Sequence, residues 1–182
     1  TKTPVCDFGK KAEDFKLKSI ESKLISLSDI KGEKATLIMF ICNHCPYVKA
    51  IIKDLAKDCN QLKKDGINSV AIMSNDTKNY PEDSFDNMIK FAKANNFGEI
   101  NYLIDETQDI AKKYGAVCTP DFFGYNKDLK LQYRGRYREL KDLKPTSGGD
   151  SDLSVAMKMI SETQAGPKEQ IPSMGCNIKW FN

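Results

Sequence analysis

The sequence predicts a single α/β domain in which a parallel βαβα unit is closed by an antiparallel hairpin. Apolar runs of strand length alternate with segments whose apolar residues recur at helical spacing, which is typical of βαβ units with right-handed crossovers. A chain of 182 residues suits one domain with a substantial core. No repeat or linker divides it, so we expect one domain over residues 1–182, with its core at about 35–163.

The composition is that of an ordinary globular chain. Hydrophobic residues make up 40% and charged residues 29%, and the net charge of +3 is spread along the chain. With no phosphate-binding glycine loop, this spread predicts no nucleic-acid partner. Apolar runs fall well short of the ~18 residues of a membrane span, so no membrane partner is expected.

Six cysteines are too sparse and too irregularly spaced for a disulfide-stapled secreted module. We therefore expect a cytoplasmic, reducing location. The chain starts at Thr1, which is compatible with a removed initiator methionine or with a cleaved leader ahead of it.

The elements are predicted in order along the chain. Alternation of apolar and polar residues at about 14–30, around the turn "SIESK", predicts an N-terminal β-hairpin with one face in solvent. The apolar run 35–42 predicts a central strand, and the stripe from Val48 to Leu62 predicts one long helix that ends at Gly66. Residues 67–75 predict the next buried strand.

The second half repeats the pattern and then closes the sheet. A helix is expected from Phe85 to Ala92, a short strand at 100–106 and a short helix that ends at Gly115. The stretch "DFFGYNKDLKLQYRG" predicts two antiparallel strands around an "NKD" turn. A polar loop at 136–150 leads to a last helix, capped by Asp150 or Ser151, and to a tail at 166–182 without periodicity.

The stretch "FICNHCPYV" contains the only close cysteine pair. Cys42 ends the predicted central strand and Cys45 enters the following helix, which places the pair at the carboxyl edge of the sheet, where open α/β sheets hold their sites. Two cysteines at this spacing lie within disulfide reach, and the helix dipole stabilises a thiolate there. We expect Cys42 to be the exposed member and His44 to lower the pKa of Cys42, making the pair more oxidising than one with Gly-Pro between the cysteines.

A Thr-Pro pair in "VCTPDFF" stands just before a predicted strand, and from the residues alone Pro120 simply starts that strand.

Together the motifs make the chain resemble the thioredoxin superfamily, specifically its peroxiredoxin-like AhpC/TSA (redoxin) branch, here with a CNHC motif. The similar segments are "FGKKAEDFKL", with Glu13 in place of a family proline, "MFICNHCPYVK", "CTPDFFGYN…YRGR" and "GCNIKW".

The resemblance covers nearly the whole chain. It implies a thioredoxin fold, with a central mixed sheet flanked by helices, an N-terminal β-hairpin extension and a C-terminal tail. It also implies that Pro120 is a cis proline that presents the backbone of Thr119 to an extended peptide or other substrate.

The resemblance further implies that Cys42 and Cys45 are the redox residues, and it leaves two chemistries open. In thiol-disulfide exchange, Cys42 attacks a substrate disulfide and Cys45 resolves the mixed disulfide. In a thiol peroxidase, the attacking cysteine belongs to P-x-x-x-T-x-x-C, which places Cys45 at the cysteine, Cys42 at the threonine and Ile38 at the proline. Two of these three positions differ from the peroxidase pattern, and a thiol donates only weak hydrogen bonds, so we rank disulfide exchange first.

A peroxidase also places an arginine near its thiolate. The chain offers only Arg134, Arg136 and Arg138, all beyond the proline loop, and we interpret Arg134 and Arg136 as exposed hairpin residues. Residues 35–41 contain no acid that could take a proton from Cys45, so that proton acceptor is unassigned.

Cys118 and Cys176 are candidates for additional redox thiols. Cys118 precedes the Thr-Pro pair, where it is either a third redox thiol or a small residue that fills the loop, and a mobile tail could bring Cys176 to the site as a resolving thiol. In a third alternative, the thiolates of Cys42, Cys45, Cys118 and Cys176 bind zinc, or fewer of them Cu(I). The preferred prediction has no metal and no cofactor. Its partners are a protein or small-molecule disulfide, or a hydroperoxide, and a thiol reductant such as thioredoxin or glutathione, in an antioxidant or redox-homeostasis role.

Overall fold

A seven-stranded mixed sheet forms the centre of the protein in a computed structural model. The structure describes residues 1–3 and 8–182. The strand order is β2-β1-β5-β4-β3-β7-β8. The strands β3 (Ala35–Phe40), β4 (Ile67–Met73) and β5 (Asn101–Ile104) are parallel, and β7 (Asp121–Asn126) and β8 (Leu131–Tyr133) follow β3 as an antiparallel pair. The predicted mixed sheet and its closing hairpin are confirmed.

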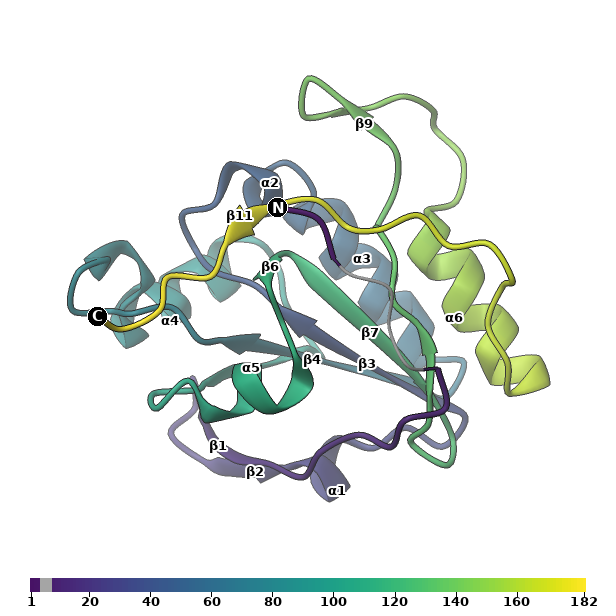
Figure 1. Cartoon of the computed structure of the whole chain (residues 1–182), viewed down its shortest axis with the longest axis horizontal. Helices are drawn as coiled ribbons and strands as arrows, with labels where there is room; N and C mark the ends of the chain where they lie inside the picture. The colour runs from purple at the N-terminus through teal and green to yellow at the C-terminus, as the bar shows by residue number, and fades with distance from the viewer. Residues whose placement is uncertain (4–7) are drawn as a thin grey trace.

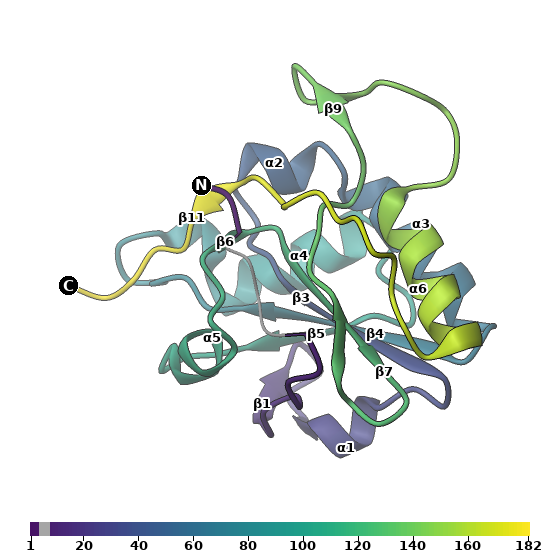
Figure 2. The ribbon, with the colours of Figure 1, turned by 45° about the vertical axis from the view of Figure 1, so that its right-hand side comes forward.

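Each face of the sheet carries a hydrophobic core. Leu37 and Met39 of β3 pack into one core, and Ile38 and Phe40 pack into the other, as the period of two along a strand requires. Because both faces are covered, every residue of β3 is buried, and this explains its unbroken apolar run. Figures 1 and 2 show α3 and α6 on one side and α1 and α5 on the other. The helices are α1 (Leu27–Ile30), α2 (Pro46–Lys49), α3 (Ile52–Lys63), α4 (Phe85–Ala94), α5 (Asp109–Tyr114) and α6 (Asp152–Thr163).

The predicted N-terminal hairpin is present as β1 (Lys16–Ser19) and β2 (Leu24–Ser26), and β1 extends the sheet by pairing with β5. The end of the predicted range differs, because residues 27–30 form helix α1. The hydroxyl of Ser26 accepts from the backbone N–H of Asp29, whose carboxylate accepts from the backbone N–H of Ser26. This capping box starts a helical turn where the alternation predicts a strand.

The long helix predicted after β3 is divided in two, so that part of the prediction is wrong. The backbone N–H of Ile51 donates to the carbonyl of Val48, three residues back, and α3 begins only at Ile52. This tighter turn interrupts the α-helical ladder, although the apolar stripe continues through it. Gly66 ends the segment as predicted, in the left-handed conformation with φ +76°.

Two segments beyond the cysteine pair position the site. The 3-10 turn η1 (Pro81–Asp83) precedes α4, which Ser84 caps through the backbone N–H of Asn87. Ser151 caps α6, as predicted. The predicted polar loop also holds two short paired strands, β9 (Leu140–Lys141) and β10 (Lys144–Pro145).

In the described part of the chain, no helix is long and apolar enough to cross a bilayer.

The tail, which lacks periodicity, is nevertheless paired with the rest of the molecule. Its strand β11 (Cys176–Asn177) runs antiparallel to β6 (Cys118–Thr119), directly before the proline loop. The backbone of Thr1 exchanges hydrogen bonds with Gly175, on the other side of the tail. Figures 1 and 2 both show β11 beside β6 with the N-terminus next to it. The tail therefore lies across the carboxyl edge of the sheet, where the cysteine pair is placed.

Candidate active site

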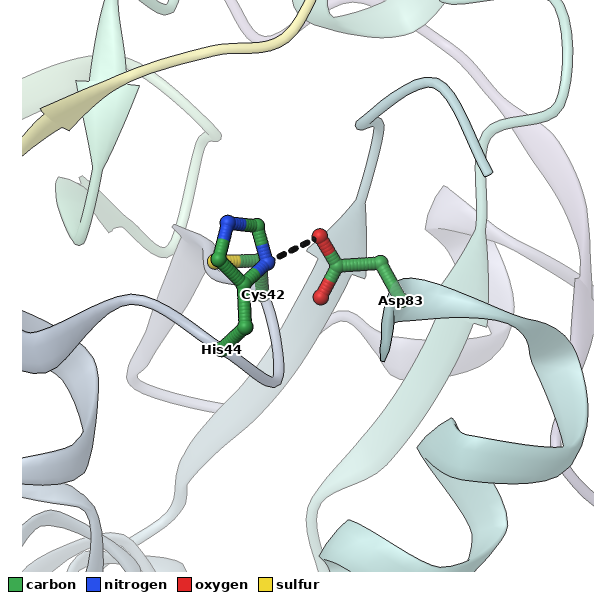
Figure 3. A group of neighbouring side chains, drawn as sticks. All are labelled: Cys42, His44 and Asp83. Carbon is green, nitrogen blue, oxygen red and sulfur yellow. Dashed lines mark ion pairs between the residues drawn. The ribbon is translucent and has the colours of Figure 1, made fainter. Parts of the chain in front are cut away.

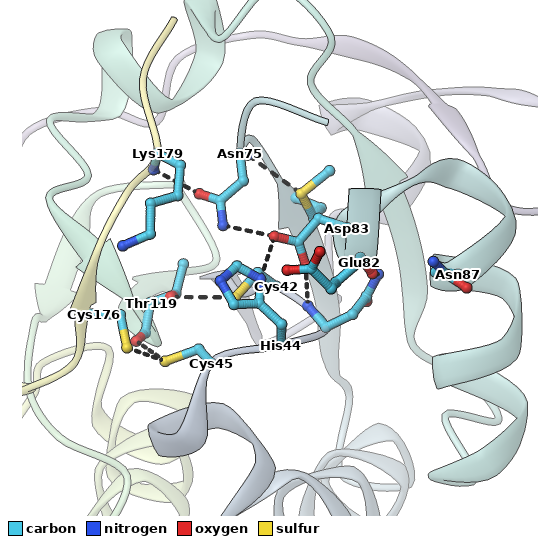
Figure 4. Close-up of polar contacts among 12 residues, drawn as sticks. Cys42, His44, Cys45, Asn75, Glu82, Asp83, Asn87, Thr119, Cys176 and Lys179 are labelled. Carbon is cyan, nitrogen blue, oxygen red and sulfur yellow. Dashed lines mark hydrogen bonds and ion pairs between the residues drawn. The ribbon is translucent and has the colours of Figure 1, made fainter. Parts of the chain in front are cut away.

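The proline loop faces the cysteine pair. The Thr119–Pro120 peptide bond is cis, as the resemblance implies. The hydroxyl of Thr119 lies 3.5 Å from Sγ of Cys42, and its carbonyl oxygen lies 3.3 Å from Sγ of Cys45 (Figure 4). Thr119 therefore contacts both sulfurs, one through its side chain and one through its backbone.

Both cysteines of the pair are buried. Cys42 follows β3 and is 1% exposed, and Cys45 caps α2, directly before Pro46, and is 0% exposed. The expectation that Cys42 is exposed is wrong, because the proline loop lies over Cys42 and the tail lies over Cys45. Each sulfur of the pair is therefore covered by a neighbouring segment.

The two cysteines of the pair have pKa values shifted in opposite directions. A hydrogen bond from Cys42 is the main factor that lowers the pKa of Cys45, and donors from Cys176 and from the backbone of Val48 add to it against the effect of burial. The same hydrogen bond, followed by burial and the charge of Asp83, raises the pKa of Cys42. These shifts favour the thiolate on Cys45, at the N-terminus of α2, whereas the sequence predicts it on Cys42.

His44 pairs with Asp83 beside the pair. Its Nδ1 lies 2.6 Å from Oδ2 of Asp83 (Figure 3). Its ring stacks on Tyr80 with 5.8 Å between the centroids. The charge of this carboxylate raises the pKa of Cys42. The expected lowering of that pKa by His44 is opposed by Asp83 and stays a prediction.

A buried acid, Asp83, lies beside Cys42 and outside the segment 35–41. It is fully buried, and its carboxylate accepts from the backbone N–H of Asn43 at 2.8 Å and from Nδ2 of Asn75 at 2.9 Å (Figure 4). Neither Asp83 nor Asn75 was identified from the sequence. The only signal is an acid that follows Pro81 in "PEDS", and this pattern equally fits an exposed turn.

Of the two additional thiols, the structure brings Cys176 to the pair. Its Sγ lies 2.8 Å from Sγ of Cys45. Cys118 is buried, its Sγ donates to the carbonyl of Pro120 at 3.5 Å, and burial followed by the charge of Asp121 raises its pKa to about 12. Cys118 therefore fills the loop. Among the described residues its sulfur donates to no other cysteine, and its redox role stays a prediction.

The four cysteines proposed as zinc ligands do not form one cluster. Among the residues that the structure describes, the only group of three or more candidate ligands is Cys42, His44 and Asp83 (Figure 3). With bonds of ~2.0–2.2 Å, tetrahedral zinc separates its nitrogen and oxygen ligands by about 3.4 Å. The 2.6 Å between His44 and Asp83 is too short for that, so this arrangement does not fit the ion.

The arginines are engaged elsewhere. Nε and Nη2 of Arg134 donate to the two carboxylate oxygens of Asp121 at 3.0 and 2.9 Å, and its guanidinium lies 4.2 Å from the ring centroid of Phe123. Arg134 is buried rather than exposed, because Asp121 at the start of β7 neutralises its charge. Arg136 is half-buried and pairs with Asp152 at 2.7 Å.

A groove adjoins the proline loop on the side of α2. Its volume is about 250 Å³, and its wall includes Tyr47, Pro120 and Phe122, with Arg138 and Lys2 also lining it. The groove offers an apolar surface next to the cis proline.

Fold and site together define the class of protein. A parallel strand trio, a closing hairpin and a cis proline facing a cysteine pair at a helix N-terminus define a thioredoxin-fold protein with a candidate thiol site. The sequence model of the AhpC/TSA family matches residues 8–134, and the chain belongs to this family. Membership of this family supports an oxidoreductase role in general.

Solved structures agree with this placement. A hypothetical protein from Sinorhizobium meliloti is 36% identical, with a TM-score of 0.91 over 100% of this chain and 98% of the other. An uncharacterized conserved protein from Geobacillus kaustophilus is 40% identical, with a TM-score of 0.89 over 100% and 96%. The thioredoxin domain of a thiol-disulfide oxidoreductase from Bacteroides vulgatus is 18% identical, with a TM-score of 0.60 over 71% and 89%, and supports the fold alone. A comparison with curated proteins gives no significant match.

Proposed function

We propose that the protein is a thiol-disulfide oxidoreductase whose redox residues are Cys42 and Cys45. The observation that carries the proposal is the cysteine pair at the N-terminus of α2, facing the cis Thr119–Pro120 bond, with Thr119 in contact with both sulfurs. Hydrogen bonding lowers the pKa of Cys45 and raises that of Cys42. A thiolate next to a second thiol is the arrangement that disulfide exchange requires.

The proposed reaction starts at Cys45 rather than at Cys42. The thiolate of Cys45 attacks a substrate disulfide, forms a mixed disulfide and releases one substrate thiolate. Cys42 then gives up its proton to that thiolate and attacks Cys45, which releases the second substrate thiolate and closes the Cys42–Cys45 disulfide. Two electrons pass to the substrate, and a thiol reductant such as glutathione or thioredoxin returns them.

Neighbouring side chains hold this pair in position. Asp83 fixes the loop between the cysteines through the backbone N–H of Asn43, and it holds His44 beside Cys42. Thr119 contacts both sulfurs, and Pro120 joins the pair to the apolar groove. A cytoplasmic role in redox homeostasis, with a protein or small-molecule disulfide as partner, agrees with this proposal.

A thiol peroxidase is the second candidate. The observation that favours it is the low pKa of Cys45, the residue at the position of the peroxidatic cysteine, with Cys42 donating to it from the position of the threonine. Cys45 would attack a hydroperoxide and become a sulfenic acid, and a neighbouring thiol would then condense with it and release water. Against this candidate, Arg134 is held by Asp121 and Arg136 by Asp152.

Parallel assays of disulfide reduction and hydrogen peroxide consumption test the proposal. With hydroxyethyl disulfide as the substrate, we expect Cys45→Ser to abolish turnover and Cys42→Ser to leave Cys45 trapped in a disulfide that Cys42 can no longer resolve, which mass spectrometry detects. Cys59→Ala changes a cysteine of the helix core and should leave turnover unchanged. Disulfide turnover that is equal in wild type, Cys42→Ser and Cys45→Ser would overturn the proposal, and peroxide turnover lost only with Cys45→Ser would favour the peroxidase.

A further inference from the structure

The C-terminal tail occupies the strand position beside the proline loop. In the antiparallel pairing of β11 with β6, Cys176 stands opposite Thr119 and Asn177 opposite Cys118. The backbone N–H of Ile178 continues this pairing by donating to the carbonyl of Val117 at 3.4 Å. An extended peptide binds a free strand edge through such backbone hydrogen bonds. The edge expected to receive a substrate is therefore filled by the chain itself.

The tail is held there by specific contacts. A Cβ atom on Gly175 would lie 2.0 Å from the carbonyl oxygen of Thr119, so only glycine allows the backbones to approach this closely. The hydroxyl of Ser173 donates to the carbonyl of Pro120 at 2.7 Å. Ile178 is 1% exposed and packs into the core on the other face of the sheet. The docked tail is thus a built feature rather than a loosely placed end.

Docking places a third sulfur next to the thiolate. Sγ of Cys176 lies 2.8 Å from Sγ of Cys45 (Figure 4). Cys42, the other member of the pair, is also a neighbour of Cys45. Cys45 can therefore form a disulfide with either neighbour. Cys176 is partly exposed, whereas Cys42 and Cys45 are buried. Among the three sulfurs, Cys176 is the one that solvent reaches most readily.

On the basis of the proposed function, we propose that the tail is the site's own bound substrate strand, and that Cys176 exchanges with low-molecular-weight disulfides on behalf of the buried pair. Extended polypeptides are excluded while the tail is docked, because they need the strand edge that β11 occupies. A small disulfide needs no strand edge and reacts with a partly exposed thiol.

Each step forms one sulfur–sulfur bond and breaks one. Cys176 passes its proton to Cys45 and attacks the small disulfide, and the released thiolate takes up that proton. Cys45 then attacks Cys176, which releases the second substrate thiolate and forms the Cys45–Cys176 disulfide. Finally Cys42 attacks Cys45, and its proton moves to the leaving sulfur of Cys176. Two electrons have passed from the pair to the substrate, and Cys176 is again a thiol.

The test compares hydroxyethyl disulfide and insulin as probes of small and polypeptide disulfides. We expect Cys176→Ser to slow turnover of hydroxyethyl disulfide by at least about tenfold. Gly175→Val retains Cys176 but forces the tail away from Thr119, so it should raise insulin reduction several-fold and slow turnover of the small disulfide. In Cys42→Ser, peptide mapping after oxidation should identify a Cys45–Cys176 disulfide.

Controls separate this inference from the proposed function. Turnover of hydroxyethyl disulfide that is unchanged in Cys176→Ser but lost in Cys45→Ser would overturn the role of the tail and leave the proposed function standing. Turnover that survives Cys45→Ser would overturn both. If circular dichroism shows that Gly175→Val is unfolded, Ser173→Ala takes its place, because Ser173→Ala loses only the hydrogen bond to the carbonyl of Pro120. Insulin reduction by Ser173→Ala that is no faster than that of wild type then counts against the proposal.

Discussion

The carboxylate of Asp83 lies 2.6 Å from Nδ1 of His44, and it joins the loop between the two cysteines to the turn before α4. Asn75, which also donates to Asp83, accepts from the backbone N–H of Lys179 at 2.9 Å. One buried acid therefore connects His44, the strand end after β4 and the C-terminal tail. Its negative charge also favours the protonated form of Cys42.

Replacing Asp83 by asparagine should lower the pKa of Cys42, because a negative charge that favours its protonated form is removed. It should also lower the free energy of unfolding by about 1–3 kcal/mol, since one amide oxygen replaces two carboxylate acceptors for Asn43, Asn75 and His44. Ultraviolet titration of the thiolates and denaturant unfolding measure these effects. Asp86→Asn, at an exposed position of α4, is the matched control. If the two variants behaved alike, Asp83 would have no such role.

Thr119→Val keeps the shape of the side chain and removes its hydroxyl. The hydrogen bond of this hydroxyl to Cys42 lowers the pKa of Cys42 against the effects of Cys45 and burial. We expect the variant to raise that pKa further and to slow closure of the Cys42–Cys45 disulfide several-fold, as measured by stopped-flow mixing with a small disulfide. Thr146→Val, in the exposed loop, should have no effect. An unchanged closure rate would remove Thr119 from the list of positioning residues.

The stability of the reduced protein should pass through a maximum with pH. Folding lowers the pKa of Cys45, so the contribution of Cys45 to the stability of the fold is fully present above its pKa of ~8.5 in the unfolded chain. This contribution is lost as the pH falls through the pKa of Cys45 in the folded protein. Folding raises the pKa of Cys42, so its contribution is present below ~8.5 and is lost as the pH rises above that value. Denaturant unfolding should therefore give a free energy that rises with pH up to about 8.5 and then falls, relative to the Cys42→Ser/Cys45→Ser double variant. A flat difference between the two proteins would contradict the assigned shifts.

Arg134→Met should destabilise the fold strongly. Burial raises the pKa of Asp121 although Arg134 opposes this, and removing the guanidinium leaves the buried carboxylate without its partner. Such a loss typically costs about 3–5 kcal/mol, and the added change Asp121→Leu should restore part of it. Arg138→Met, which loses one hydrogen bond to the carbonyl of Ser147, should cost far less in thermal unfolding. Equal losses for the two arginine variants would show that the buried pair does not stabilise the fold.

The elements that depend on local pattern were predictable from the sequence. The apolar run of β3, the "NKD" turn between β7 and β8 and the cap at Ser151 each carry their signal within a few residues. The turn at Ile51 was not predictable, because the apolar stripe runs through the break. Periodicity reports which face is buried, and it does not report where a hydrogen-bond ladder shifts.

The site was predictable in its residue types and not in its charges. Cys42, Cys45 and Pro120 lie together as the motifs indicate. Asp83 comes from a turn 39 residues beyond His44, and Cys176 from a tail 131 residues beyond Cys45, and only the packed fold brings them to the pair. The pKa shifts of the two cysteines depend in part on these distant contacts, and for this reason they could not be worked out from the sequence.

The assignment of the thiolate to Cys45 is tested most directly by nuclear magnetic resonance of reduced protein carrying carbon-13 at the cysteine Cβ atoms. Each Cβ shift reports the protonation of its own sulfur, and single serine variants assign the signals. We predict that Cys45 titrates below neutral pH while Cys42 keeps its proton beyond the ordinary thiol value of ~8.5. A Cβ signal of Cys42 that titrates before that of Cys45 would contradict the account.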